Sequence, residues 1–288
     1  MIIDCHCHAG SGDGLTAPWD TVASLDKYVA RAARAGIDRT VLFAAFHSDY
    51  TIANYEVSRI VNARPDRFIG FCFVNSVRDR GRIADLVRTA VERYGFVGIK
   101  AHRFHGDLTR EVCDVARALG LPILYDVMGK VSVVEMLATA YPDVPFIFPH
   151  LGSFADNWRA NLAMIDHLVR HANVHTDSSA VQRFDFLEQA IQRAGAHKLL
   201  FGSDGPWIHP GVELAKIREL RLSPNDESLV LSGNILRLIA NPLRSRYAPT
   251  RRALHGATTA SRRSAEASSR SAHTAGASPR AASAAHGL

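Results

Sequence analysis

The sequence has no long hydrophobic run and few cysteines. No apolar stretch approaches the roughly 18 residues that a membrane-spanning helix needs, and the first residues lack the basic and apolar blocks of a signal peptide. The four cysteines in 288 residues form no CxxC pair and fall in segments predicted to be buried. These absences argue against a membrane protein and a disulfide scaffold, and they predict a cytoplasmic protein with free thiols.

The basic charge of the chain is confined to its end. The formal net charge is +6, but residues 248–288 alone hold six arginines and one acidic residue, which leaves about +1 for residues 1–247. This placement argues against a nucleic-acid-binding domain, although a weak anionic partner of the tail stays open. The tail is rich in Ala, Ser and Arg, and its only large aliphatic residues are Leu254 and Leu288. We therefore predict that residues 248–288 are disordered.

Residues 1–247 alternate short β-rich runs with longer helical patterns. Apolar residues recur three and four positions apart in 82–95 and 110–120, and Gly95 and Gly120 stand where these helices should end. The alternation is typical of βα units around a parallel sheet. Eight strands with following helices predict one (β/α)₈ barrel, with strands at 2–7, 39–46, 68–74, 96–102, 122–127, 145–151, 173–179 and 198–204.

Two histidines stand one residue apart at the end of the first predicted strand. In an extended chain Asp4, His6 and His8 point to one face. Both imidazoles can then reach a single cation such as zinc. In a parallel barrel, functional residues gather at the carboxyl ends of the strands, and these ends carry an unusual number of ligand-type and charged side chains: His6, His8, Lys100, His102, Asp126, His150 and Asp204.

Several stretches resemble the amidohydrolase superfamily, specifically the amidohydrolase-2 group of metal-dependent barrel enzymes. The resemblance covers residues 1–241 and rests on the ordered strings "IIDCHCH", "GFVGIKAH", "YPDVPFIFPHLGS", "NVHTDSS", "KLLFGSDGPW" and "SGNILRLI". It implies that His6 and His8 are metal ligands. It further implies that Asp204 is both a ligand and the proton acceptor, and that His150 lies beside the metal and orients water or substrate.

One position departs from the family pattern. The family commonly ends the fifth strand with a histidine ligand, whereas this chain reads "PILYDVMG" and has Asp126 there. A carboxylate can still bind zinc, manganese or iron, so we expect Asp126 to be a fourth ligand. The alternative is that Asp126 faces the substrate and the metal has three protein ligands.

Three further residues are predicted to bind substrate. In some relatives a lysine on the fourth strand is carboxylated and bridges two metals, but Lys100 can equally bind a substrate carboxylate as a point charge, and we favour the substrate role. His102 and Tyr125 are candidate pocket residues, with structural roles as the alternative.

The resemblance implies a metal-dependent hydrolase of a small ester, lactone or amide that uses a metal-activated water. The expected cofactor is one divalent ion, zinc before manganese or iron. A nonoxidative decarboxylase of a small carboxylic acid is the alternative on the same metal site. An inactive barrel that serves as a binding protein is the alternative of another class. A small-molecule substrate is the expected partner, and a homo-oligomer is an open expectation.

Overall fold

A computed structural model describes residues 1–15, 22–154 and 157–240 of the chain. The predicted disordered tail, residues 248–288, and its boundary lie outside the described residues. Within the described residues, no helix has both the length and the apolar character needed to cross a membrane.

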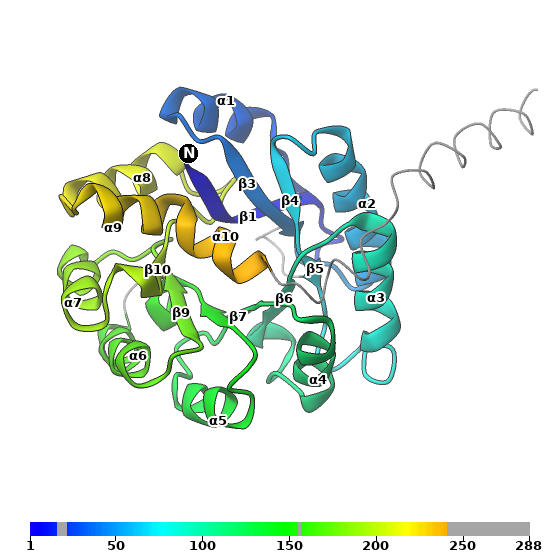
Figure 1. Cartoon of the computed structure of the whole chain (residues 1–288). Coiled ribbons are helices and arrows are strands. Elements are labelled where there is room, and N and C mark those ends of the chain that lie inside the picture. The colour runs from blue at the N-terminus through cyan, green and yellow to red at the C-terminus, as the bar shows by residue number, and fades with distance from the viewer. Residues whose placement is uncertain (16–21, 155–156, 241–288) are drawn as a thin grey trace, which may run out of the picture. The chain divides into compact units, whose positions relative to one another are not determined.

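Eight parallel strand segments close into a barrel, as predicted (Figure 1). They are β1 (Ile3–Ser11), β3 (Arg39–Ala44), β4 (Phe68–Gly70) continued by β5 (Cys72–Phe73), β6 (Ile99–His102), β7 (Ile123–Asp126), β8 (Phe146–Phe148), β9 (Val174–Asp177) and β10 (Leu199–Leu200). The last strand returns to the first, because the Cys5 N–H donates to the Phe201 carbonyl at 2.9 Å. Phe71, the residue between β4 and β5, is held in the barrel by its N–H, which donates to the Leu42 carbonyl of β3 at 2.9 Å.

A helix follows each barrel strand and covers its outer face (Figure 1). These helices are α1 (Asp26–Ala35), α2 (Tyr50–Ala63), α3 (Ile83–Tyr94), α4 (Arg110–Leu119), α5 (Ser132–Ala140), α6 (Trp158–Arg170), α7 (Phe184–Ala194) and α8 (Pro210–Glu219). Gly95 and Gly120 end α3 and α4 with φ of 71° and 61°. This confirms both predicted stops, since a left-handed residue at this position favours glycine.

Short elements complete the fold. They are β2 (Val22–Ala23), α9 (Pro224–Ser228), α10 (Asn234–Ile239), the 3₁₀ turns η1 (Arg103–His105), η2 (His150–Gly152) and η3 (Ala196–Lys198), and the π-helical turn η4 (Leu229–Gly233). β2 pairs antiparallel with the end of β1.

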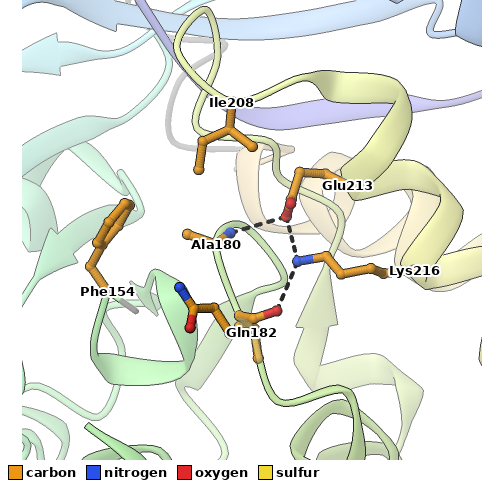
Figure 2. Close-up of a pocket in the computed structure, with 7 residues that line it drawn as sticks. Phe154, Ala180, Gln182, Ile208, Glu213 and Lys216 are labelled. Carbon is orange, nitrogen blue, oxygen red and sulfur yellow. Dashed lines mark hydrogen bonds and ion pairs between the residues drawn. The ribbon is translucent and has the colours of Figure 1, made fainter. Parts of the chain in front are cut away.

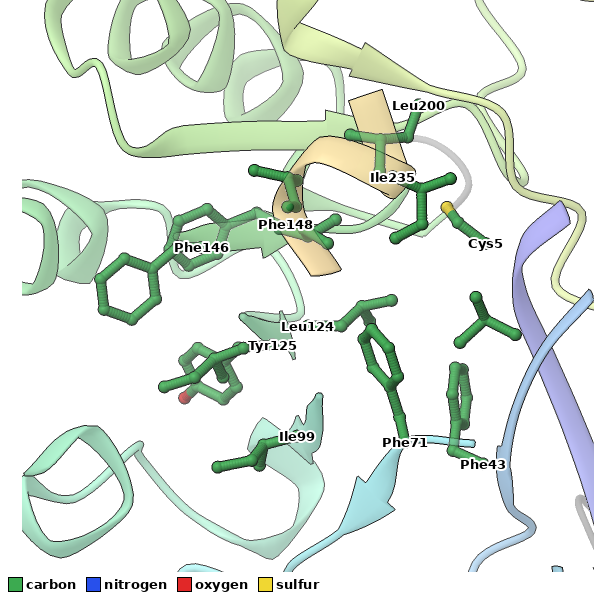
Figure 3. Packing of buried hydrophobic residues seen from close by; sticks show 14 of the residues in the cluster. Cys5, Phe43, Phe71, Ile99, Leu124, Tyr125, Phe146, Phe148, Leu200 and Ile235 are labelled. Carbon is green, nitrogen blue, oxygen red and sulfur yellow. The ribbon is translucent and has the colours of Figure 1, made fainter. Parts of the chain in front are cut away.

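Helix α10 closes one end of the barrel. The side-chain amide of Asn234 donates to the carbonyls of Ala196 at 2.8 Å and Leu199 at 2.7 Å, at the start of β10. Ile235 of α10 belongs to the same buried cluster as Cys5 and Leu200 (Figure 3). Because α10 covers the amino-terminal ends of the strands, their carboxyl ends form the opposite, open end.

A bulge in β1 overturns one expectation about its side chains. The pairing of β1 with β3 shifts register between Asp4 and Cys7, which moves part of the strand by one residue. Asp4 therefore does not share the face of His6: its carboxylate accepts the Tyr28 hydroxyl of α1 at 2.7 Å and the Ser203 N–H at 2.9 Å. Burial raises the pKa of Asp4 to about 6, in spite of these hydrogen bonds. Asp4 thus joins β1 to α1 and to the segment that follows β10.

Candidate functional site

Backbone strain gathers at the carboxyl ends of the strands. Six of the described residues other than glycine have a positive φ, and five of these lie just beyond the ends of β7 to β10: Met128, His150, Leu151, Ala180 and Asp204. The left-handed conformation costs such residues about 1–2 kcal/mol. It persists where surrounding contacts impose it, and such strain is common at functional sites. The strain thus marks the open end of the barrel as the candidate site.

His6, His8 and Asp204 converge there. Asp204 Oδ1 lies 3.3 Å from His6 Nε2 and 3.6 Å from His8 Nε2, and all three side chains are buried or nearly so. Donor atoms about 2.0–2.1 Å from a tetrahedral zinc are roughly 3.3–3.4 Å apart. The spacing of these atoms thus matches the edges of a coordination tetrahedron.

Hydrogen bonds fix the orientation of both imidazole rings. His6 Nδ1 lies 2.8 Å from Asp177 Oδ2, and His8 Nδ1 lies 3.0 Å from the Ala44 carbonyl. Each acceptor places the ring proton on Nδ1, so the lone pair of each Nε2 faces Asp204. Burial, followed by the nearby Lys100 charge, lowers the pKa of His6 and lowers that of His8 well below its usual value. These shifts favour the neutral imidazole, which is the form that binds metal.

Asp177 and Ser179 support the site and were not predicted from the sequence. Asp177 Oδ1 accepts hydrogen bonds from the Ser179 N–H at 3.0 Å and from the His150 N–H at 3.2 Å. Burial disfavours the Asp177 carboxylate, but His6 and its hydrogen bond outweigh burial and hold the pKa well below the usual range. The signals in the sequence were the string "NVHTDSS", which contains both residues, and the position of Asp177 near the end of a predicted strand, but neither assigned them a role.

Lys100 is buried at the centre of this end of the barrel. Its Nζ lies 3.5 Å from His6 Nε2 and 4.7 Å from the centre of the Phe43 ring. Burial lowers the pKa of Lys100, although the Asp126 and Asp204 carboxylates oppose that shift. Lys100 thus lies beside the His6, His8 and Asp204 group, at the strand end where the sequence analysis expected it.

Asp126 contacts two histidines but not the His6, His8 and Asp204 donor atoms. Its Oδ2 lies 3.1 Å from His102 Nε2 and 3.5 Å from His150 Nε2. Burial disfavours the Asp126 carboxylate, yet His102 and its hydrogen bond hold the pKa well below the usual range. Among the described residues, Asp126 belongs to none of the groups whose donor atoms are close enough to share one metal ion.

His150 lies at the site, whereas Tyr125 lies away from it. The Nδ1 atom of His150 is 2.9 Å from the Ser179 carbonyl, and the His150 ring centre is 5.0 Å from that of His6. Tyr125 precedes Asp126 in β7 and is fully buried, with its hydroxyl accepting the Leu108 N–H at 3.3 Å. Because strand side chains alternate between faces, this placement argues against the predicted substrate contact of Tyr125.

A cavity of about 390 Å³ lies beside the site (Figure 2). It is lined by Phe154, Ala180, Val181, Gln182, Ile208, Glu213 and Lys216. Phe154 joins it to the site, because the ring centres of Phe154 and His150 are 5.3 Å apart. Glu213 and Lys216 pair at 2.6 Å, and Glu213 Oε2 accepts the Ala180 N–H at 3.0 Å. None of these residues was predicted: five lie in loops, which carry no periodic signal, and Glu213 and Lys216 lie in α8, where helical periodicity does not distinguish a cavity-lining polar residue from a solvated one.

The donor set fits a divalent cation. His6, His8 and Asp204 offer two neutral imidazole nitrogens and one carboxylate oxygen within 4.8 Å of one another. This is the ligand chemistry of zinc and other first-row metals. A parallel (β/α)₈ barrel with such a donor set at the strand ends defines the class of metal-dependent barrel enzymes.

The chain belongs to the amidohydrolase family, whose model matches residues 3–240. The fold is similar to three solved structures. One is a 5-carboxyvanillate decarboxylase from Sphingomonas paucimobilis, with a TM-score of 0.67, 15% identity, and coverage of 83% of this chain and 98% of that one. No curated protein matches the chain in sequence.

The second solved structure is a dihydroxybenzoic acid decarboxylase from Polaromonas with bound manganese and an inhibitor, with a TM-score of 0.60, 17% identity, and coverage of 83% and 96%. The third is a probable 2-pyrone-4,6-dicarboxylic acid hydrolase from Acinetobacter baumannii with citric acid bound, with a TM-score of 0.65, 18% identity, and coverage of 83% and 99%. These likenesses concern the fold.

Proposed function

We propose that this protein is a metal-dependent hydrolase of a small ester, lactone or amide. The convergence of His6 Nε2, His8 Nε2 and Asp204 Oδ1 carries the proposal, because these atoms would hold one divalent cation. When bound, the cation lowers the pKa of a water molecule and polarises the substrate carbonyl. The nitrogen-rich donor set favours zinc, and manganese, which the Polaromonas relative binds, is the alternative.

Asp204 is the proposed proton carrier. It lies between the two histidines, so it can accept a proton from the attacking water and return it to the leaving group. His150 faces the same space with Nε2, and in its protonated form it can donate to the negative charge that develops on the carbonyl oxygen. Asp126 is the proposed positioning residue for His150. This role leaves the metal three protein ligands, as in the alternative stated above, but it does not place Asp126 against the substrate.

Lys100 and the cavity of Figure 2 are proposed to bind the substrate. The buried Lys100 ammonium suits a substrate carboxylate, and the Acinetobacter relative is described with a tricarboxylic acid bound. His102, which ends β6 beside Asp126, can contact the same group. The apolar wall formed by Phe154, Val181 and Ile208 would take the rest of a small molecule.

Decarboxylation is the second candidate, and the position of Lys100 favours it. A substrate carboxylate drawn to Lys100 would lie beside the proposed metal ligands, since Nζ is 3.5 Å from His6 Nε2. Two of the similar structures described above are decarboxylases. Incubation with small carboxylic acids, esters and lactones separates the reactions, because decarboxylation releases carbon dioxide and ester hydrolysis releases acid.

Metal analysis tests the site that both reactions need. We expect about one equivalent of divalent metal at the open end of the barrel, and its loss in the His6→Ala/His8→Ala double variant together with all turnover. His197→Ala removes an exposed histidine outside every candidate metal group of the described residues, so it should keep both. Full metal retention in the double variant would overturn the site, and an inactive barrel need not hold metal at all.

Asp204→Asn should separate chemistry from metal binding. The amide oxygen can still coordinate weakly beside His6 and His8, so much of the metal should remain, whereas an amide cannot accept the proton. General acid–base participation is worth roughly 10²- to 10⁴-fold, and we expect a loss in kcat near the upper end. Steady-state kinetics on metal-quantified enzyme measures it. A metal-replete variant within tenfold of the wild type would move the proton acceptor to another residue.

A further inference from the structure

A second group of ligand-type side chains lies on the outside of the barrel. His167 and His171 stand four residues apart on α6 and at its end, and Glu135 reaches them from α5. We call these three residues the α5–α6 cluster. His171 lies between the end of α6 and the start of β9. The cluster therefore lies toward the amino-terminal ends of the strands, away from the proposed active site.

The donor atoms of the α5–α6 cluster have the spacing of metal ligands. Glu135 Oε2 lies 3.0 Å from His171 Nε2 and 3.6 Å from His167 Nδ1, and the three donor atoms fall within 4.8 Å of one another. The edges of a zinc coordination tetrahedron are roughly 3.3–3.4 Å. Residues four apart on a helix share a face, and the two imidazole rings lie nearly parallel, with centres 5.8 Å apart. The backbone thus holds both rings ready before any cation arrives.

The surroundings suit entry and binding of a cation. The Glu135 side chain is 51% exposed, so the cluster opens to solvent. His167 is 6% exposed and the His171 side chain is 14% exposed, so neighbouring side chains hold both rings in place.

Arg170 is the competitor for the same donor atoms. Its guanidinium lies 3.1 Å from His167 Nδ1 and 3.4 Å from Glu135 Oε2. The Arg170 side chain is 55% exposed, so it can turn into solvent when a cation arrives. Because an exposed ion pair contributes little, at most about fivefold in an equilibrium constant, Arg170 should weaken metal binding without preventing it.

We propose that Glu135, His167 and His171 form a second metal site, for a first-row transition-metal cation such as Zn²⁺ or Ni²⁺. The cation would have two nitrogen ligands and one oxygen ligand and would join α5 to α6, with water in its remaining positions. Imidazole ligands select such metals over Mg²⁺ or Ca²⁺. The site does not depend on the proposed catalytic function.

Equilibrium dialysis against Zn²⁺, followed by elemental analysis, tests the proposal. The wild type should bind one equivalent more than the His167→Gln/His171→Gln double variant, whether or not the open end of the barrel holds a cation. Glu135→Gln should weaken the second site by at least about tenfold, since it removes one ligand and the negative charge. The His6→Ala/His8→Ala variant should retain the second equivalent.

Arg170 supplies the sharpest control. Arg170→Gln should tighten the second site by up to about fivefold, whereas Arg170→Lys keeps the positive charge and should stay near the wild-type affinity. Added Zn²⁺ should also slow amide hydrogen exchange at the end of α6 in the wild type but not in the double variant. Equal Zn²⁺ stoichiometry in the wild type and the double variant, or weaker binding in Arg170→Gln than in the wild type, would overturn the proposal.

Discussion

Asp177 controls the ring of His6 through one short hydrogen bond. The 2.8 Å contact fixes which nitrogen of His6 carries the proton, and the same carboxylate holds the backbone of His150. Sequence patterns could identify His6, His8 and Asp204 because each stands at a strand end within a recognisable string. They could not assign a role to Asp177, because a carboxylate at a strand end looks the same whether it binds a metal or orients a ligand.

We expect Asp177→Asn to weaken metal binding at the proposed active site. Loss of a group that orients a histidine ligand typically costs 10- to 100-fold in metal affinity. Chelator competition with Zn²⁺ measures this affinity. Asp185→Asn is the matched control, because Asp185 is exposed and pairs with Arg183 at 2.7 Å. An Asp177→Asn protein with wild-type affinity would show that the His6 orientation does not depend on this contact.

The strands and helices of the barrel were predictable, and their local irregularities were not. Each predicted strand has its counterpart, from β1 to β10, because β-branched and aromatic runs alternate with helical periodicity. The register shift between Asp4 and Cys7 leaves no mark in that periodicity, so the strict alternation predicted for Asp4 was wrong. Tyr125 was a candidate pocket residue with a structural role as the alternative, and alternation along β7 together with its hydrogen bond to Leu108 favours the structural role.

The buried His175 side chain of β9 makes the stability of the fold sensitive to acid. His175 of β9 is 2% exposed, and its Nδ1 is without a hydrogen-bond partner among the described residues. Burial, followed by the charges of Lys198 and Arg237, lowers the pKa of His175 to about 3. The unfolded chain has the ordinary histidine pKa of about 6.5, so below that pH the unfolded state binds a proton that the folded state refuses.

His175→Leu should therefore flatten the acid limb of the stability curve. The His175 contribution is fully present above pH of about 6.5 and is lost as pH falls toward 3, at up to about 1.4 kcal/mol per pH unit. Urea unfolding at several pH values between 4 and 7 measures the free energy of unfolding of both proteins. Asp4 and the other titrating groups are common to both, so the difference isolates His175. Parallel curves would contradict the assignment.

Three properties of the molecule as a whole stay predictions from the sequence: an anionic partner of residues 248–288, the location and the oligomeric state. The formal charge of the chain falls from +6 to about +1 when residues 248–288 are set aside, so interactions with anionic partners depend on that segment. A cytoplasmic location and a homo-oligomeric state are likewise expectations of composition and family. The amidohydrolase match over residues 3–240 leaves the final segment outside the family model.

Deletion of residues 248–288 should leave folding and turnover nearly unchanged. The segment has Leu254 and Leu288 as its only large aliphatic residues, so it cannot bury enough apolar surface to offset the entropy of ordering. A domain of this size shifts by roughly 2–4 °C in Tm per kcal/mol, and changes outside a core stay within about 0.5 kcal/mol. We therefore expect a Tm within about 2 °C of the full chain, measured by calorimetry, and an equal kcat. A larger drop in either would show that the segment packs on the barrel, whereas selective loss of binding to single-stranded DNA would assign it an anionic partner.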